Sequence, residues 1–389
     1  MEAATVVDKL ASLPQGVRLM AAAKDMDDVW LVGGAVRDLL LGLEPAELDI
    51  VVDGPIDNLL EALGGEVKRF ERFGTATVTS DGERFDIARA RSETYARSGE
   101  LPEVSPATIE EDLSRRDFTV NAIAVRLADG LVHADRRALS DLEAGVVRVL
   151  HAGSFVDDPT RLWRCARYAA RLGFGVEPET AALAAVALPG AVSGERLGHE
   201  LRLALLEPSP TALFTILEEL NAGALVEGFD TQPSALNAAL DLLGEQGSAP
   251  LTTLAACCAG VELDLLTRWL NFLQFSAEDR DCVLVASRWV TGEPLRNADS
   301  RSAIAAAARG APLEAVALAG GENARLWLSE LRHVRLEITG DDLIAAGVEP
   351  GPAVGEALNY ALVETLDQAI EGASEQLETA VQFANRSPQ

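Results

Sequence analysis

Two carboxylates and a pair of glycines near the N-terminus have the types and spacing of a site for phosphate and metal. Glu47 and Asp49 are separated by one residue, so both side chains would project from the same face of a β-strand. Their oxygens are the hard ligands that Mg²⁺ prefers, and Mg²⁺ keeps coordination positions for substrate phosphates. Gly33 and Gly34 lack Cβ atoms, so the backbone there can approach a polyphosphate closely. Arg37 follows one helical turn later, where its guanidinium can reach phosphate oxygens.

These residues require a strand, a glycine turn, a helix and a second strand in close succession. Residues 31–42 supply an apolar run, the glycine pair and a helical pattern. Residues 47–53 supply the second strand, in which Leu48 and Ile50 would point into a core. The first turn of the helix offers unpaired N–H groups and a positive dipole end to an anion. A lone glycine pair or acid-X-acid is more often a turn or a solvated strand face, but their order predicts a two-metal site for nucleotidyl transfer.

A third carboxylate, Asp86, lies in a segment with the pattern of a β-hairpin. The elements predicted after the first unit are a helix and three strands, at residues 57–63, 66–70, 75–79 and 84–88. Residues 80–83, Ser-Asp-Gly-Glu, are a turn signal between the last two strands. Asp86 could help to ligate a metal or deprotonate an attacking hydroxyl, or it could simply be a polar residue on an alternating strand. The alternation of strands and helices predicts a small α/β head with a mixed sheet.

The glycine pair and the two carboxylates together resemble a known family. Residues 32–38, Val-Gly-Gly-Ala-Val-Arg-Asp, are followed ten residues after Arg37 by the acid-X-acid pair. This combination resembles the head of the class II tRNA nucleotidyltransferases (CCA-adding enzymes) and bacterial poly(A) polymerases. That family usually has Asp-X-Asp here, whereas this chain has Glu47-Leu-Asp49. The glutamate carboxylate lies one bond farther out, and a misplacement of about 1 Å near reacting atoms can cost about a hundredfold in rate.

A second motif of the same family spans residues 115–122. The run Arg-Arg-Asp-Phe-Thr-Val-Asn-Ala resembles the family's RRDFT-X-NA motif nearly letter for letter. An isolated charge cluster at a helix start is usually a solvated cap. The resemblance implies instead that Arg116 contacts the nucleotide phosphates, that Asp117 contacts the ribose hydroxyl and that Asn121 positions the segment. A carboxylate only accepts hydrogen bonds, so it suits a 2′-hydroxyl and favours ribonucleotides.

A third motif, at residues 155–168, predicts a helix rich in arginine. Asp158 fits the N-cap position and Pro159 the first helical position, so the helix should run to about Leu172. Four arginines fall on one stripe of this helix, namely Arg161, Arg164, Arg167 and Arg171. Such a stripe is most often a solvated face. Without interleaved glutamates, however, the four would repel one another unless an anion lies between them.

The resemblance gives this arginine helix a role in reading the base. In class II enzymes an acid and an arginine at the positions of Asp158 and Arg161 contact the edge of the incoming base, so the protein acts as the template. An aspartate accepts from an exocyclic amine and an arginine donates to a ring nitrogen or a carbonyl. Cytosine and adenine can therefore both be matched after a small rotation. Arg164 and Arg167 would then hold the triphosphate or position the pair.

The chain of 389 residues is strongly acidic, with a net charge of −28. That is the wrong sign for a protein that holds a polyanion such as RNA. The charge is unevenly distributed: residues 175–389 carry −19, with twelve arginines and no lysine, and residues 1–174 carry −9. An acidic outer surface around a locally basic cleft would reconcile these numbers. Arginine, which predominates among the basic residues, suits fixed phosphate and base contacts.

An all-α region is expected after the α/β head, because the chain beyond Gly175 shows alanine- and leucine-rich helical patterns without a clean repeat. The predicted domains are a catalytic head at residues 1–150, a helical neck for base recognition and RNA binding at 151–230, a helical body at 231–320 and a helical tail at 321–389. The four cysteines and four histidines show no zinc or disulfide spacing. No apolar run is long enough to cross a bilayer, so we expect a cytoplasmic protein without a membrane partner.

The patterns and the resemblance together predict template-independent transfer of CMP or AMP from CTP or ATP to the 3′ end of RNA, preferably tRNA, with Mg²⁺ as cofactor. The predicted catalytic residues are Glu47, Asp49 and Asp86, of which Glu47 and Asp49 hold the metal. The predicted nucleotide-binding residues are Gly33, Gly34, Arg37, Arg116, Asp117, Asp158, Arg161, Arg164 and Arg167. The alternatives are a CC-only or A-only tRNA enzyme, a poly(A) polymerase, and a nucleotide-binding relative that has weakened or lost catalysis. The oligomeric state is left open.

Overall fold

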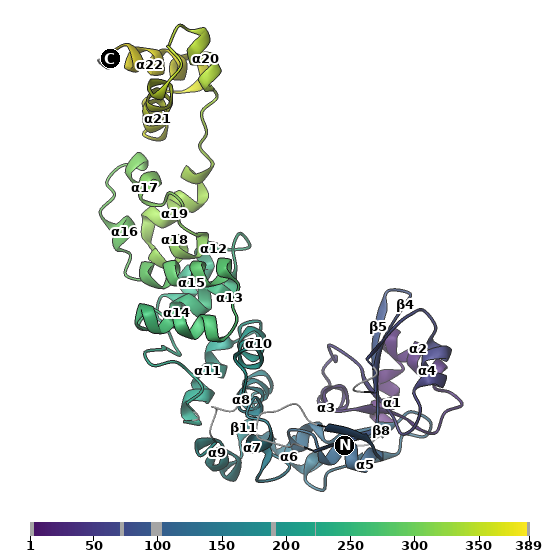
Figure 1. Cartoon of the computed structure of the whole chain (residues 1–389). Coiled ribbons are helices and arrows are strands. Elements are labelled where there is room, and N and C mark those ends of the chain that lie inside the picture. The colour runs from purple at the N-terminus through teal and green to yellow at the C-terminus, as the bar shows by residue number, and fades with distance from the viewer. Residues whose placement is uncertain (1–3, 71–73, 95–102, 188–191, 222, 387–389) are drawn as a thin grey trace. The chain divides into compact units, whose positions relative to one another are not determined.

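The computed structural model describes residues 4–70, 74–94, 103–187, 192–221 and 223–386. The chain divides into two compact units, residues 1–225 and residues 226–389. Figure 1 labels helices and strands of the chain and colours it by residue number. The first unit contains an α/β head followed by helices, and every described element of regular structure in the second unit is a helix. The predicted fold class is therefore confirmed. The finer boundaries predicted within the helical region stay predictions.

A mixed seven-stranded sheet forms the centre of the head. In the order β3-β4-β5-β2-β1-β8-β9 its strands are Glu66–Phe70, Thr75–Ser80, Glu83–Arg89, Asp49–Val52, Val29–Val32, Ile123–Arg126 and Val132–Ala134. In this sheet β2 and β5 pair in parallel, and the other described neighbours are antiparallel. The strands predicted at residues 66–70, 75–79 and 84–88 are confirmed to within one residue at each end.

The register of β2 and β5 sets two of the predicted catalytic carboxylates side by side. Asp49 is paired with Asp86 across the two strands, and Thr77 of β4 is paired with Asp86 on its other side. Ile50 and Ile87 alternate with these carboxylates and are buried on the opposite face of the sheet. The backbone pairing therefore brings together two residues that are far apart in the sequence.

Glu47 lies in a bend just before this pair of strands. Strand β2 begins at Asp49, so the prediction that one strand carries both Glu47 and Asp49 is wrong. The neighbouring strand β1 ends at Val32, and the chain turns at Gly33. Strand β1 therefore does not extend far enough to pair with the backbone of Glu47. The Glu47 side chain is exposed as a result.

The two faces of the sheet are covered differently. The helices on the first face are α1 (Ala4–Leu10), α2 (Pro14–Ala22), α3 (Gly34–Leu41) and α4 (Asp57–Leu63), and they build the larger apolar core. Helix α4 is the helix predicted at residues 57–63. Helix α5 (Ile109–Ser114) covers the second face, where its apolar side chains join a smaller cluster with Trp30, Val51 and Ala124. Asp49 and Asp86 lie on this second face, because they alternate with the isoleucines of the larger core.

In its described part, the first unit also contains two short pairs of strands, β6 (Arg91–Thr94) with β7 (Glu103–Pro106) and β10 (Val146–Val147) with β11 (Gly175–Val176), and six further helices. The helices are α6 (Ala138–Ala144), α7 (Ser154–Asp157), α8 (Arg161–Leu172), α9 (Pro178–Ala185), α10 (Gly194–Leu205) and α11 (Pro210–Glu219). Helix α8 packs against α10 and α11. These contacts place the arginine helix beside α10, whose first turn begins more than twenty residues after α8 ends.

The start of α8 differs from the prediction. The helix begins at Arg161, and Thr160 occupies the N-cap position, so the assignment of Asp158 as the N-cap is wrong. Asp158 has an extended backbone with φ −139° and accepts hydrogen bonds from the Thr160 backbone N–H (3.1 Å) and hydroxyl (2.7 Å). Its carboxylate is also bound by an arginine of α10, as described below.

The described regular structure of the second unit is helical. The helices are α12 (Leu236–Leu243), α13 (Ala249–Cys257), α14 (Leu263–Phe272), α15 (Ala277–Trp289), α16 (Glu293–Arg296), α17 (Arg301–Ala307), α18 (Leu313–Ala319), α19 (Gly321–Ser329), α20 (Gly340–Ala345), α21 (Pro352–Leu366) and α22 (Gly372–Arg386). Helices α20 to α22 share an apolar cluster of their own. In the described part of the chain, no helix has the length and apolar character needed to span a membrane.

Candidate active site

An open cavity of about 710 Å³ in the first unit is lined by the second face of the sheet and by residues of helices α8 and α10. Eight of the predicted site residues line it, namely Gly34, Asp49, Asp86, Arg116, Asp117, Asp158, Arg161 and Arg164. The remaining four, which are Gly33, Arg37, Glu47 and Arg167, are not among its lining residues. The cavity therefore joins all three sequence motifs, which lie far apart along the chain.

The carboxylates of the sheet have different surroundings. Asp86 accepts a hydrogen bond from the Thr77 hydroxyl (2.6 Å) and forms an ion pair with Arg84 (3.1 Å). Partial burial raises the pKa of Asp49, the positive charge of Arg116 opposes that rise, and the negative charges of Glu47 and Asp86 add to it. The pKa stays above its ordinary value, so the protein compensates the negative charge at Asp49 incompletely.

This incompletely compensated charge fits a divalent cation. Glu47 and Asp49 both offer hard oxygen ligands, and their negative charges repel each other without a cation between them. Within the described ranges of the chain, no group of three or more His, Cys, Asp or Glu side chains is arranged to hold a metal ion. A cation at Asp49 would therefore complete its coordination with phosphate oxygens and water, which is the usual arrangement for Mg²⁺ at nucleotides.

Gly33 makes room for an arginine of the second motif. Its backbone has φ +65° and ψ −127°, a conformation that glycine adopts readily and other residues rarely. A Cβ atom built on Gly33 would lie 2.5 Å from Nη1 of Arg116. Arg116 is held there by Asp112, whose carboxylate accepts a hydrogen bond from Nη2 at 3.0 Å. The group that lies close to Gly33 is therefore Arg116, a candidate ligand of phosphate. A direct contact between Gly33 and phosphate stays a prediction.

Arg37 positions Asn121 in this structure. Its side chain is 2% exposed, and its Nη1 donates a hydrogen bond to Oδ1 of Asn121 at 2.6 Å. Its Nε donates to Asp38, and its guanidinium lies 5.0 Å from the centre of the Tyr168 ring. The Nδ2 group of Asn121 in turn donates to Asp117 at 2.9 Å. A chain of hydrogen bonds therefore connects the first motif to the second. Arg37 belongs to this chain but does not line the cavity.

Asp117 accepts three hydrogen bonds and forms an ion pair. One carboxylate oxygen accepts from the Phe118 backbone N–H (2.8 Å) and from Asn121, and the other accepts from Nε of Arg164 (2.8 Å) and lies 2.7 Å from its Nη2 in an ion pair. Burial would raise the pKa of Asp117, but the charge of Arg164 and the hydrogen bonds from Asn121 and Arg164 outweigh it and lower the pKa to about 2. Because Nε and Nη2 of Arg164 both contact the second oxygen, a ribose hydroxyl that binds there would compete with Arg164.

The arginine stripe of α8 is neutralised by carboxylates of other elements. Arg164 pairs with Asp117 as described, Arg167 with Glu200 of α10 (3.5 Å), and Arg171 with Glu207. Arg161 is buried and donates to the Ser154 hydroxyl (2.7 Å) and to the backbone carbonyl of Arg115 (2.9 Å). The negative charge expected between these arginines is thus supplied in part by carboxylates of the protein itself. Only the fold could reveal these partners.

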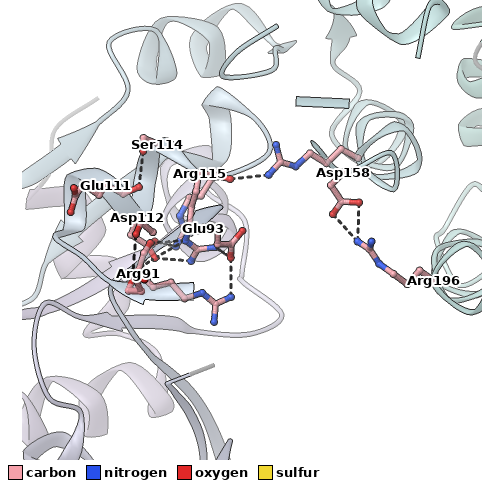
Figure 2. A network of polar contacts seen from close by, with 12 residues as sticks. Arg91, Glu93, Glu111, Asp112, Ser114, Arg115, Asp158 and Arg196 are labelled. Carbon is pink, nitrogen blue, oxygen red and sulfur yellow. Dashed lines mark hydrogen bonds and ion pairs between the residues drawn. The ribbon is translucent and has the colours of Figure 1, made fainter. Parts of the chain in front are cut away.

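Asp158 is bound by an arginine of α10. Nη2 of Arg196 donates to both carboxylate oxygens of Asp158, at 2.8 Å each (Figure 2). Arg161, the predicted partner of Asp158 in base reading, has its guanidinium at Ser154 and Arg115 instead. Arg196 was not identified from the sequence, because it lies 38 residues from Asp158 and no local pattern marks the pair.

Asp112, which was not identified from the sequence, holds the second motif in place. The carboxylate of Asp112 accepts from Arg115 (2.6 Å), and Arg115 also pairs with Glu93 (2.7 Å) (Figure 2). The same carboxylate accepts from Arg116 at 3.0 Å. Burial would raise the pKa of Asp112, but the charges of the two arginines lower it. A signal for this residue was present, since Asp112 precedes the arginines by three and four positions, the spacing of neighbours on a helix.

Known proteins resemble the chain over nearly its whole length. Residues 29–148 match the model of the poly A polymerase head domain. The A-adding tRNA nucleotidyltransferase of Halalkalibacterium halodurans is 33% identical over 386 residues, which cover 94% of this chain and 90% of that protein. The chain belongs to the tRNA nucleotidyltransferase family. The CC-adding tRNA nucleotidyltransferase of Deinococcus radiodurans is 35% identical and covers 89% of this chain and 91% of its own length. A solved structure of a CCA-adding enzyme in an apo form superposes with a TM-score of 0.81 at 28% identity, covering 97% and 98% of the two chains.

Membership in the tRNA nucleotidyltransferase family confirms the resemblance drawn from the three motifs and assigns the chain to the transferases. The family generally uses a divalent metal, which agrees with the charge at Asp49. The relatives' names differ in the nucleotides added: one is A-adding, one is CC-adding and one is CCA-adding. Family membership therefore gives the class of reaction without giving the number or identity of the nucleotides.

Proposed function

We propose that the chain transfers CMP or AMP from CTP or ATP to the 3′ end of tRNA. The observation that carries this proposal is the cavity that Asp49 shares with Arg116, Asp117 and Asp158. A bound nucleoside triphosphate requires charge neutralisation at its phosphates, a polar contact at its ribose and a hydrogen-bonding edge at its base. The cavity supplies residues for each of these from a different motif. The relatives support tRNA as the acceptor.

The proposed reaction is an attack of the 3′-terminal hydroxyl oxygen of the tRNA on the α-phosphorus of the nucleotide. An O–P bond forms, the bond from the α-phosphorus to the bridging oxygen breaks, and pyrophosphate leaves. Glu47 and Asp49 would hold Mg²⁺, which when bound neutralises charge on the phosphates and makes the hydroxyl more acidic. We assign the hydroxyl proton to the carboxylate of Asp86, which Thr77 and Arg84 hold in a fixed orientation.

The remaining residues bind and orient the nucleotide in this proposal. Arg116 donates to the triphosphate, and Asp158 accepts from the exocyclic amine of cytosine or adenine. Arg164 is shared between Asp117 and the nucleotide, and Arg161 completes the base site once its guanidinium turns toward Asp158. Arg37 acts through Asn121 and is a positioning residue. The described cysteines are all free, which agrees with a cytoplasmic location for the reaction.

The test is an incorporation assay with labelled CTP and labelled ATP supplied separately, with Mg²⁺. The acceptors are a tRNA that lacks the terminal CCA and a tRNA that ends in CC. A CCA-adding enzyme labels the first acceptor with CTP and the second with ATP. A CC-adding enzyme uses CTP alone, an A-adding enzyme uses ATP alone, and a poly(A) polymerase extends either acceptor by many adenosines. If nucleotides bind and no label enters RNA, catalysis has been lost and the proposal fails.

A further inference from the structure

We propose that Arg196 is the positioning residue of Asp158 and thereby determines which bases the cavity accepts. This inference rests on the proposed function, because it concerns how the base of the incoming nucleotide is read. It adds to the predicted site a residue of α10 that belongs to none of the three motifs. The inference is based on the contact of one guanidinium nitrogen of Arg196 with both oxygens of the Asp158 carboxylate (Figure 2).

The hydrogen bonds around Asp158 distinguish its two oxygens. Oδ1 accepts from the Thr160 backbone N–H (3.1 Å), from the Thr160 hydroxyl (2.7 Å) and from Arg196 (2.8 Å). Among donors in the described ranges, Oδ2 accepts from Arg196 (2.8 Å). A carboxylate oxygen has two lone-pair positions, so Oδ1 is fully used and Oδ2 keeps one for a ligand. Thr160 and Arg196 together therefore fix which oxygen faces an incoming base.

That oxygen discriminates by its chemistry. Cytosine and adenine carry an exocyclic amine, which donates a hydrogen bond, where uracil and guanine carry a carbonyl oxygen, which accepts. A carboxylate held in place accepts from the amine and repels the carbonyl. A carboxylate that can rotate, or admit a water molecule between itself and the base, discriminates less, because water both donates and accepts. The selectivity of the cavity thus depends on the group that stops Asp158 from rotating.

Helix α10 is suited to hold Arg196 in a fixed position. The Ser193 hydroxyl caps the helix by accepting from the Arg196 backbone N–H (3.4 Å), so the arginine lies in the first, ordered turn. One turn later Glu200, which is 7% exposed, pairs with Arg167 of α8 (3.5 Å). Arg196 and Glu200 both line the cavity, so a single face of α10 is tied to Asp158 and, one turn later, to α8. The guanidinium that contacts Asp158 is therefore anchored on packed helices.

The experiment compares Arg196→Gln and Arg196→Lys with the unaltered chain and with Arg171→Gln. Arg171 is the matched control, since it also joins a helix to a carboxylate outside that helix, Glu207, but does not line the cavity. Equilibrium dissociation constants for CTP, ATP, UTP and GTP are measured in Mg²⁺, together with kcat and KM for transfer to tRNA. Thermal unfolding of each variant is recorded.

We expect Arg196→Gln to reduce the preference for CTP over UTP, and for ATP over GTP, by about tenfold, the effect of one good base contact. KM for the preferred nucleotide should rise while kcat changes little, and Arg196→Lys, which keeps the charge on a shorter side chain, should lie in between. Arg171→Gln should keep the preference of the unaltered chain. An Arg196→Gln protein with unchanged preference overturns the inference.

Two further outcomes are decided by the same measurements. If Arg196→Gln does not fold, Arg196→Lys replaces it, and an unaltered preference in that variant also overturns the inference. If the unaltered chain binds nucleotides selectively but transfers none, the proposed function fails while the dissociation constants still test Arg196. Loss of selectivity to the same extent in Arg171→Gln would show that any weakened helix contact relaxes the cavity, which contradicts a specific role for Arg196.

Discussion

Glu47 is the residue at which this chain departs from the aspartate usual in its family, and the structure places it in a bend ahead of β2. A glutamate has an additional methylene group, and a residue outside the strand ladder can adjust its backbone. The longer side chain can therefore still bring its oxygens to a metal at Asp49. The metal assignment of Glu47 stays a prediction, and a substitution tests it directly.

We expect Glu47→Asp to keep transfer within about tenfold of the unaltered chain, and Glu47→Gln to lose about a hundredfold, because only the latter removes the charge of a metal ligand. Single-turnover rates at saturating nucleotide, measured over a range of Mg²⁺ concentrations, provide the comparison. A large increase in rate for Glu47→Asp would mean that the native glutamate weakens the site. Equal rates for all three proteins would remove Glu47 from the metal site.

Asp49 gives a second prediction at this scale, because its raised pKa reports a cost to the folded state. Asp49→Asn removes both the metal ligand and the repulsion from Glu47 and Asp86. Transfer should fall by about a hundredfold or more, while the thermal unfolding temperature stays equal or rises. Asp57→Asn, an exposed aspartate on α4, is the control and should keep full activity. A folded Asp49→Asn protein with nearly full transfer would contradict the metal assignment.

At the scale of elements, the turn between β1 and α3 and the second motif depend on each other through Gly33. An alanine there would need φ +65° and would put its Cβ atom 2.5 Å from Arg116. Gly64 is a matched control, because it has φ +61° and no atom within 4 Å of a built Cβ. Both substitutions carry a backbone cost of about 1 kcal/mol or more. Only Gly33→Ala should also weaken triphosphate binding, and equal nucleotide affinity in the two variants would contradict this coupling.

Helix α8 is linked to the second motif by the Arg164–Asp117 pair, which gives a pH-dependent prediction. The pKa of Asp117 is about 2 in the folded chain, below the ordinary value of 3.8. In the pH window between these values the unfolded state binds more protons, so the stabilisation is complete above about pH 4 and is lost as the pH falls toward 2. It amounts to roughly 2 kcal/mol at neutral pH.

Denaturant unfolding between pH 5 and pH 2 measures this contribution. The unaltered chain should lose stability more steeply in this window than Asp117→Asn, which has no carboxylate to protonate. The comparison between the two proteins cancels the acid effects of the other carboxylates, which both share. Parallel curves would show that Arg164 does not stabilise the charged form of Asp117.

At the scale of the whole molecule, the division into residues 1–225 and 226–389 separates the candidate active site from the helical region that follows. Residues 226–389 contain 24 acidic residues and ten arginines, so they carry −14, half of the net charge, and contribute none of the cavity lining. Seven arginines in the described part of the first unit line the cavity. This distribution agrees with a protein whose net charge is negative and whose nucleotide site is locally rich in arginine.

The two compact units predict separable stability. Leu266 on α14 is fully buried in the second unit, and Leu266→Ala should cost about 2–5 kcal/mol there. Calorimetry should show a lower unfolding temperature for one transition, while nucleotide binding in the first unit is unchanged. Leu60→Ala on α4 is the reciprocal control in the first unit. Loss of nucleotide affinity in Leu266→Ala would show that the units are not energetically independent.

The sequence by itself determined the elements and the class of chemistry. Strand alternation, the glycine pair and the helical patterns are local, so they predicted β3 to β5, α4 and an all-helical C-terminal region. The three motifs predicted a nucleotide site because residue types at short spacing carry chemical meaning. The extent of β2 was missed, since the end of a strand depends on where its partner turns away.

Only the tertiary structure decided which charges meet. Asp49 lies beside Asp86 through parallel pairing, Arg164 is neutralised by Asp117, and Asp158 is bound by Arg196. Each of these contacts joins residues more than thirty positions apart, and hydrogen bonds and ion pairs leave no periodic trace in the sequence. Their partners are chosen by the packing of α8 against α10 and of the sheet against the second motif, which no local pattern encodes.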